Sequence, residues 1–248
     1  MLHIVLWKWN QPGFRETYTH DHVNALAKAV RKHINGTPHR IVCVTDDAGK
    51  IDESVDVHPL WKDHNTTPNA SGARFPSCYR RLKLFDPQTQ REMKIAKDDR
   101  VMSLDLDTLI TGDLKPIVTR KERFVGWAVR GTRHIRVFNG SMFMFSAGDF
   151  QEIWSTFNPL TSPTKALTSG YFGSDQGWLS LNLSQRTDCA GWHFPQVASF
   201  PRELQRRPAL PNGVTIACFH GKKKPWHADV QREAPWIKQH YLFNQKDA

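Results

Sequence analysis

The sequence predicts an α/β protein with a mixed central sheet flanked by helices. In the first half, apolar segments of strand length alternate with segments of helical period, which is typical of parallel strands joined by helices. In the second half, strand-like segments follow one another, so the sheet is expected to continue in mixed orientation. The 248 residues are 39% hydrophobic and 23% charged, a globular composition that excludes disorder and coiled coil. We expect a single domain over 1–248, with one half over 1–115 and the other over 116–248.

The first half contains four expected strands and two expected helices. The strands cover 3–9, 40–45, 55–58 and 100–110, and the helices cover 21–34 and 77–85. The helix over 21–34 has apolar side chains at helical spacing, and Gly36 stands where a C-terminal cap belongs. The stretch over 62–76 is polar and has no periodicity, which indicates a loop.

The second half adds three expected strands and three expected helices. The strands cover 123–129, 135–145 and 214–219, and the helices cover 149–157, 174–183 and 230–243. Pro235 must lie near the start of the last helix or break it, because proline has no backbone N–H to donate.

The balance of charge indicates an anionic partner. Lys and Arg number 34 against 24 Asp and Glu, a net charge of +10. The partner is nucleic acid, a membrane surface or a phosphorylated small molecule, and composition does not choose among them. No apolar run approaches the roughly 20 residues of a membrane-spanning helix, so we expect no transmembrane segment and a cytoplasmic protein. The four cysteines form no CxxC pair and suit a reducing compartment.

Two aspartates interrupt the apolar strand expected over 100–110. Asp105 and Asp107 are two residues apart, so in a strand their carboxylates point to the same face. Buried carboxylates need a metal or a positive partner, and open α/β sheets bind ligands at the carboxyl ends of their parallel strands. Oxygen ligands of this kind suit Mg²⁺ or Mn²⁺. The alternative is a strand end with two solvated turn aspartates.

A second group of polar residues follows the last expected strand. Cys218, Phe219 and His220 precede Gly221, and three lysines stand at 222–224. Gly221 allows close approach of a ligand to the backbone, and the lysines are placed to receive an anion. A solvated basic loop is the alternative.

These segments occur in the order seen in a known family. They are Asp105-Leu-Asp107, Phe138-Asn139-Gly140-Ser141-Met142-Phe143-Met144-Phe145, Ser174-Asp175-Gln176, His220-Gly221 and Lys224-Pro225-Trp226. In this order the chain resembles, over roughly residues 3–227, the glycogenin-like (family eight) glycosyltransferases, which include bacterial lipopolysaccharide galactosyl- and glucosyltransferases. The resemblance implies a single-domain GT-A (Rossmann-like) fold that binds a nucleotide-sugar, usually a UDP-sugar. It also implies a divalent cation, Mn²⁺ or Mg²⁺, and transfer with retention of configuration.

The resemblance assigns the metal ligands to Asp105, Asp107 and a histidine in the closing motif. The sequence departs from the family there, because the place of that histidine is taken by Cys218 and a histidine stands two residues later, at His220. Two residues are one period of a strand, so His220 is expected to face the same side. A thiol is a poor ligand for a hard cation, and we therefore assign the third ligand to His220.

The resemblance also implies a set of donor-binding residues. They are Asp105, which is placed near the ribose, Lys83, Arg80, Asn139, Gly221, Lys224 and Trp7. Lys224 is expected on the diphosphate, and Lys83 or Arg80 on the phosphate or sugar. Trp7 and Trp9 stand where the family has small residues before the base, so one of them is expected to stack on the base and at least one to pack in the core.

The catalytic pair is expected at Asp175 and Gln176, beside the reacting face of the sugar. An amide is a feeble nucleophile, so attack from the face that the diphosphate leaves is favoured over a covalent intermediate on Gln176. Asp175 is then expected to position the sugar or stabilise its oxocarbenium-like charge.

The acceptor and two other functions stay open at this point. An anionic glycan, a lipid-linked saccharide, a protein and DNA are all possible acceptors, and the unassigned positive charge favours an anionic one. A basic nucleic-acid-binding protein is one alternative function, although no binding module stands out and the basic residues are spread along the chain. A metal-dependent phosphohydrolase or nucleotidyltransferase that uses the same aspartates is the other.

Overall fold

The computed structural model describes residues 1–10, 13–14, 16–70, 78–130 and 136–242. A seven-stranded sheet forms its centre, with strand order β3-β2-β1-β4-β7-β6-β8. These strands are β1 (Leu2–Lys8), β2 (His39–Thr45), β3 (Asp56–Pro59), β4 (Arg100–Leu104), β6 (Phe124–Arg130), β7 (Arg136–Ser146) and β8 (Cys189–Trp192). The first four are mutually parallel, and β7 is antiparallel to both of its neighbours. The sheet is therefore mixed, as the sequence predicts.

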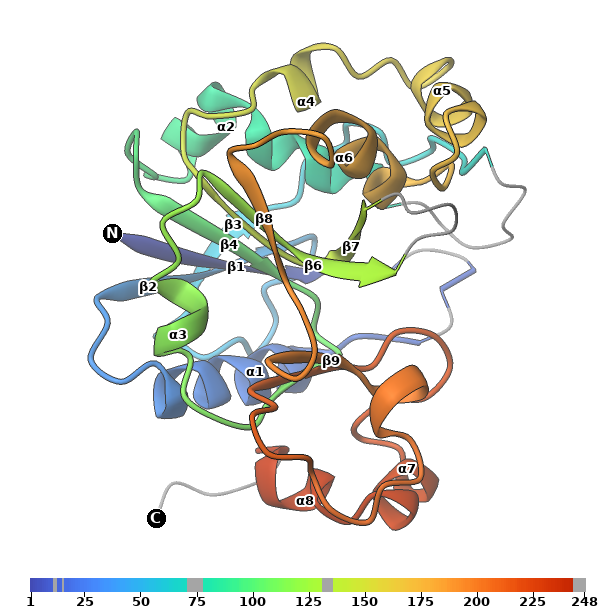
Figure 1. Ribbon diagram of the computed structural model, residues 1–248. Coiled ribbons are helices and arrows are strands. Elements are labelled where there is room, and N and C mark those ends of the chain that lie inside the picture. The colour runs from blue at the N-terminus through green and yellow to red at the C-terminus, as the bar shows by residue number, and fades with distance from the viewer. Residues whose placement is uncertain (11–12, 15, 71–77, 131–135, 243–248) are drawn as a thin grey trace.

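Helices cover both faces of this sheet (Figure 1). One face carries α1 (His20–His33), and the other carries α2 (Pro87–Glu92), α4 (Glu152–Ser155) and α6 (Asp175–Leu183). The side chains of β1 point alternately to the two faces of the sheet. Ile4 and Leu6 pack with α1, whereas Val5 and Trp7 pack with the helices on the opposite face. This is the period of two that a strand buried on both faces requires.

A second sheet of three short strands lies beside the first. Its order is β5-β10-β9, formed by β5 (Thr108–Ile110), β10 (Ile216–Cys218) and β9 (Val197–Ser199). The strand expected over 100–110 is therefore two strands in two sheets, with Asp105 and Asp107 in the turn between them. After this turn the chain pairs with β10, and the backbone N–H of Phe219, just after β10, donates to the carbonyl of Asp107. Asp105 and Asp107 were predicted on one face of a strand, and they lie instead in this turn.

Other differences concern short helices. The segment expected as a helix over 77–85 is a 3-10 helix, η1 (Tyr79–Phe85), and residue 77 lies outside the described residues. The tail expected as one helix forms α7 (Ala228–Glu233) and α8 (Ile237–His240), separated at Pro235. Four short elements were not foreseen: α3 (Lys115–Val118), α5 (Ser162–Thr168), β9, and the π-helical turn η3 (Phe200–Leu204). The strand β8 and the helix α2 were not foreseen either.

Candidate functional site

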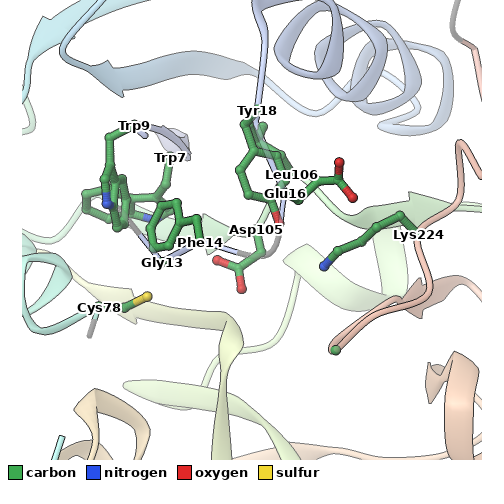
Figure 2. Close-up of a pocket in the computed structure, with 11 residues that line it drawn as sticks. Trp7, Trp9, Gly13, Phe14, Glu16, Tyr18, Cys78, Asp105, Leu106 and Lys224 are labelled. Carbon is green, nitrogen blue, oxygen red and sulfur yellow. The ribbon is translucent and has the colours of Figure 1, made fainter. Parts of the chain in front are cut away.

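A cavity of about 260 Å³ lies where β1 and β4 end. Trp7, Trp9 and Phe14 line one side of it, and Lys224 lines the other, with Asp105 between them (Figure 2). Since β1 and β4 are parallel neighbours, the cavity lies at the carboxyl edge where open α/β sheets bind ligands. Figure 2 shows the Asp105 carboxylate and the Lys224 ammonium pointing toward the same space.

Arg81 joins the two halves of the site. Its Nη1 donates to Oδ1 of Asp105, and its Nη2 donates to Oδ2 of Asp175 at 2.6 Å. Nη1 also donates to the carbonyl of Gly140 at 3.1 Å. Arg81 and Asp175 are both more than nine-tenths buried, so this is a largely desolvated cluster of one cation and two carboxylates. It fixes the end of β4 against the first residue of α6.

Gly140 makes this bridge possible. A Cβ atom at position 140 would stand 2.9 Å from Nη2 of Arg81 and 3.1 Å from Oδ2 of Asp175. The segment Asn139-Gly140-Ser141 was predicted to belong to the site. At its central position it contributes a backbone carbonyl, that of Gly140, and no side chain. The Asn139 side chain accepts from the backbone N–H of Ser141 at 2.9 Å, and Gln176 accepts weakly from the N–H of Gly140 at 3.4 Å.

The Asp105 carboxyl has a perturbed pKa. Burial raises it from 3.8 to about 6, Arg81 opposes the rise, and the neighbouring charge of Asp107 adds to it. Asp105 thus holds its proton at a pH where the unfolded chain has lost it.

We expect this perturbation to show as a pH-dependent loss of stability. Because the folded-state pKa is the higher one, the contribution of Asp105 is fully present below about pH 4 and is lost as the pH rises through about 6. Urea unfolding of the unaltered protein and of Asp105→Asn between pH 4 and pH 7 measures this. The free energy of unfolding should fall with rising pH more steeply in the unaltered protein, and parallel curves would contradict the assignment.

Asp107 is paired with Lys224. The Lys224 ammonium donates to Oδ2 of Asp107 and to the carbonyl of Phe219, and both side chains are more than nine-tenths buried. The hydroxyl of Tyr18 donates to the same carboxylate oxygen at 3.4 Å. The resemblance implied that Lys224 binds the diphosphate and that Asp107 binds the metal. In the structure these two side chains form an ion pair with each other.

His220 is close to this group but has another partner. Its Nε2 lies 2.8 Å from Oγ of Ser199, and its ring lies 5.7 Å from that of Trp127. Burial lowers the pKa of His220 below its usual value, so the ring is neutral at pH 7. The strand β10 ends at Cys218, so the prediction that His220 lies on the same strand face as Cys218 is wrong. Cys218 itself is buried in the core, and burial raises its pKa well above the usual value, so its thiol stays protonated.

The donor set suits a divalent cation in part. Asp105 and Asp107 offer the oxygen ligands that Mg²⁺ and Mn²⁺ prefer, and two carboxylates suffice when a substrate phosphate and water complete the coordination. Within the described residues, no group of three or more His, Cys, Asp or Glu side chains is arranged to hold a metal ion. The residues therefore fit a cation held by two carboxylates, and His220 as a third ligand stays a prediction.

The wall opposite Lys224 is aromatic and carries an unused hydrogen-bond donor. The rings of Trp7 and Trp9 meet edge to face at 6.1 Å, and Trp7 donates through Nε1 to Oγ of Ser103 at 2.8 Å. Nε1 of Trp9 is buried and has no partner in the described chain. A buried N–H without a partner is costly, so a ligand with an acceptor group at this point would relieve it. Trp9 was considered with Trp7 as a residue that stacks on the base, and Trp7 was the one assigned to the donor site.

The remaining predicted residues lie around the cavity or away from it. Gly221 lines it and has φ +92°, a conformation that favours glycine. The Arg80 guanidinium covers the ring of Trp9 at 5.5 Å and is therefore near the aromatic wall. Lys83 pairs with Asp63 at 2.6 Å and does not line the cavity. Arg81, between these two, is the basic residue of η1 that reaches the site.

Comparisons with known proteins agree with the fold and leave the family unassigned by sequence. No family model matches the chain, and no curated protein matches it. Among solved structures, the galactosyltransferase LgtC, determined with donor and acceptor sugar analogues, superposes with a TM-score of 0.58 at 14% identity, covering 99% of this chain and 97% of LgtC. The glycosyltransferase GlyE of Streptococcus pneumoniae has a TM-score of 0.54 at 13% identity, covering 92% of this chain and 57% of GlyE. The bifunctional glycosyltransferase WbbM has the same TM-score at 12% identity, and the match covers half of WbbM.

These matches confirm two predictions made from the sequence. The chain has the mixed α/β fold of LgtC over nearly its whole length, and its resemblance to bacterial glycosyltransferases of the GT-A type holds at the level of the fold. No helix in the described part of the chain is long and apolar enough to cross a membrane.

Proposed function

We propose that the protein is a metal-dependent glycosyltransferase that moves a hexose from a nucleotide-sugar, a UDP-sugar by preference, to an acceptor hydroxyl with retention of configuration. One observation carries the proposal. Arg81 ties Asp105, at the carboxyl end of β4, to Asp175, at the start of α6, and this bridge stands beside a cavity that Lys224 and an aromatic wall enclose. The arrangement offers one end to an aromatic base and the other to a diphosphate. The chain that carries this site has the fold of LgtC.

The residues of the chain divide the binding of the donor among them. Trp9 contributes an aromatic face and an N–H without a partner, which suits a base or ribose with an acceptor oxygen. Lys224 and the backbone at Gly221 lie at the other end, where the diphosphate charge has to be compensated. Asp105 and Asp107 would hold Mn²⁺ or Mg²⁺, which, when bound, supplies Lewis-acid stabilisation of the departing diphosphate.

Asp175 is the residue we assign to the reacting sugar. It is 6% exposed, it begins α6, and Arg81 holds its carboxylate in one orientation. A fixed carboxylate beside the anomeric carbon stabilises positive charge that develops as the diphosphate leaves. Gln176 presents an amide at the same helix end and serves as a hydrogen-bond partner, so attack on the face that the diphosphate vacates is the route that these residues support.

The acceptor is proposed to be an anionic glycan or a lipid-linked saccharide. A diphosphate needs only a few positive charges, so most of the net charge of +10 is not used by the donor. The remaining charge is available to an acidic partner, DNA included.

Turnover of the donor tests the proposal. The protein is incubated with a panel of nucleotide-sugars and Mn²⁺, and nucleotide release is measured without acceptor. We expect slow hydrolysis of one donor, with a loss of about 10²-fold or more in Asp107→Asn, because the carboxylate that would hold the cation becomes neutral. Lys223→Ala, whose lysine pairs with Glu233, is the matched control and should retain turnover. No hydrolysis of any donor, together with salt-sensitive DNA binding, would contradict the proposal, and so would release of phosphate from simple phosphate esters.

A further inference from the structure

A second cavity, of about 460 Å³, opens beside Ser199 and Trp127, the two residues that His220 contacts. It is lined by Trp127, Val129, His193, Phe194, Arg202 and Glu203, among others. The lining residues come from β6, from the segment after β8, from the end of β9 and from η3. None of them is among the residues predicted from the sequence.

The cavity adjoins the candidate site through one residue. His220 contacts Ser199 and Trp127, which both line the second cavity, and Gly221, next to it in the chain, lines the first. Trp127 is also the register partner of Asn139 across β6 and β7. Trp127 thus links the wall of the second cavity to the strand that carries Asn139 and Gly140, and the Gly140 carbonyl accepts from Arg81 in the candidate site.

The side chains that line the cavity suit a saccharide that carries one acidic group. Phe194 is 46% exposed, and an exposed aromatic face packs against the C–H face of a sugar ring. Glu203 accepts from the backbone N–H of Ser199 through Oε2, which leaves its other oxygen for a sugar hydroxyl. Arg202 is exposed, and its guanidinium makes no ion pair within the described residues. Among the lining residues that the structure describes, the basic side chains are Arg202 and His193, whereas a nucleic acid needs a row of cations for successive phosphates.

We propose that the second cavity is the acceptor subsite, and that it takes a saccharide whose phosphate or carboxylate is bound by Arg202. The sugar ring lies on Phe194, and its hydroxyls donate to Glu203. The subsite rests on the proposed function for its role in transfer, but the binding of an acidic saccharide does not depend on it. It would account for part of the positive charge that the donor does not use.

Binding measurements without any donor test the subsite. The probes are glucose 6-phosphate, glucuronate, glucose and inorganic phosphate, titrated into the protein and followed by isothermal calorimetry. We expect both acidic sugars to bind more tightly than glucose and than inorganic phosphate. In Arg202→Ala, affinity for the acidic sugars should fall about tenfold or more, because a charge-assisted hydrogen bond is lost, and affinity for glucose should stay the same.

Two variants serve as controls. Arg206→Ala removes an exposed arginine just beyond η3 that does not line the cavity, and it should bind every probe like the unaltered protein. Phe194→Ala should weaken all three sugars and leave inorganic phosphate unchanged. Equal binding of the acidic sugars by Arg202→Ala and the unaltered protein would overturn the subsite, as would inorganic phosphate that binds as tightly as glucose 6-phosphate.

Failure of the subsite and failure of the proposed function give different results. If Arg202→Ala hydrolyses donor normally but binds acidic sugars as well as the unaltered protein does, the transferase stands and the subsite is wrong. If no donor is hydrolysed while Arg202 still selects acidic sugars, the binding site stands and the transferase is wrong.

Discussion

Arg81→Met is expected to lower the free energy of unfolding by about 3–5 kcal/mol, because it leaves the buried Asp175 carboxylate without its counter-ion. The same variant removes the cation that opposes the raised pKa of Asp105, so the loss should be greater at pH 8 than at pH 5, where Asp105 is mostly protonated. Urea unfolding at the two pH values measures both effects. Donor hydrolysis should fall about 10²-fold or more, since Asp175 is no longer held in place.

Two further variants separate the buried pair from a general effect of removing an arginine. Arg123 also pairs with a carboxylate, that of Asp149, but its side chain is 60% exposed, so Arg123→Met should cost about 1 kcal/mol or less. The double variant Arg81→Met with Asp175→Asn should recover part of the lost stability, because the uncompensated charge is gone. A loss in Arg81→Met no larger than in Arg123→Met would show that the bridge does not hold the two halves together.

The choice among the basic residues of η1 could not be made from the sequence. Arg80, Arg81 and Lys83 were expected on one helix, and Lys83 or Arg80 was assigned to the donor from the resemblance alone. The segment is a 3-10 helix with three residues per turn, so Cys78, Arg81 and Leu84 align on one face. Cys78 lines the cavity and Leu84 is fully buried, which carries Arg81 inward between them. The helix type depends on tertiary packing, which a single sequence does not reveal.

The partners of Asp105 and Asp107 could not be predicted from the sequence either. Their place at the end of an apolar strand and their need for positive partners were predictable, because carboxylates among apolar residues are costly without them. Their partners were not, since Arg81 is 24 residues from Asp105 and Lys224 is 117 residues from Asp107. The division of the segment into β4 and β5 also depends on a contact with Phe219. The order of elements and the carboxyl edge of the sheet followed from local pattern, whereas the ion pairs at that edge depend on distant segments.

Lys224→Gln is expected to bind Mn²⁺ more tightly than the unaltered protein and yet to hydrolyse donor about 10²-fold more slowly. In the structure the Lys224 ammonium holds the carboxylate of Asp107, so a cation has to displace it before that carboxylate becomes a ligand. Glutamine can still donate a hydrogen bond to Asp107 but carries no charge, and the competition is relieved. The slower hydrolysis follows because the positive charge that compensates the diphosphate is missing.

Measurements of metal binding and of turnover therefore move in opposite directions, which no simple loss of structure produces. The thermal midpoint of Lys224→Gln should rise more on addition of Mn²⁺ than that of the unaltered protein, because a ligand that binds the folded state more tightly stabilises it more at the same concentration. Lys224→Arg keeps the charge and should show neither the tighter binding nor the full loss of turnover. Weaker Mn²⁺ binding in Lys224→Gln would mean that the lysine and the cation do not compete for Asp107. In that case the two charges act on the donor independently, and the ion pair with Asp107 only positions Lys224.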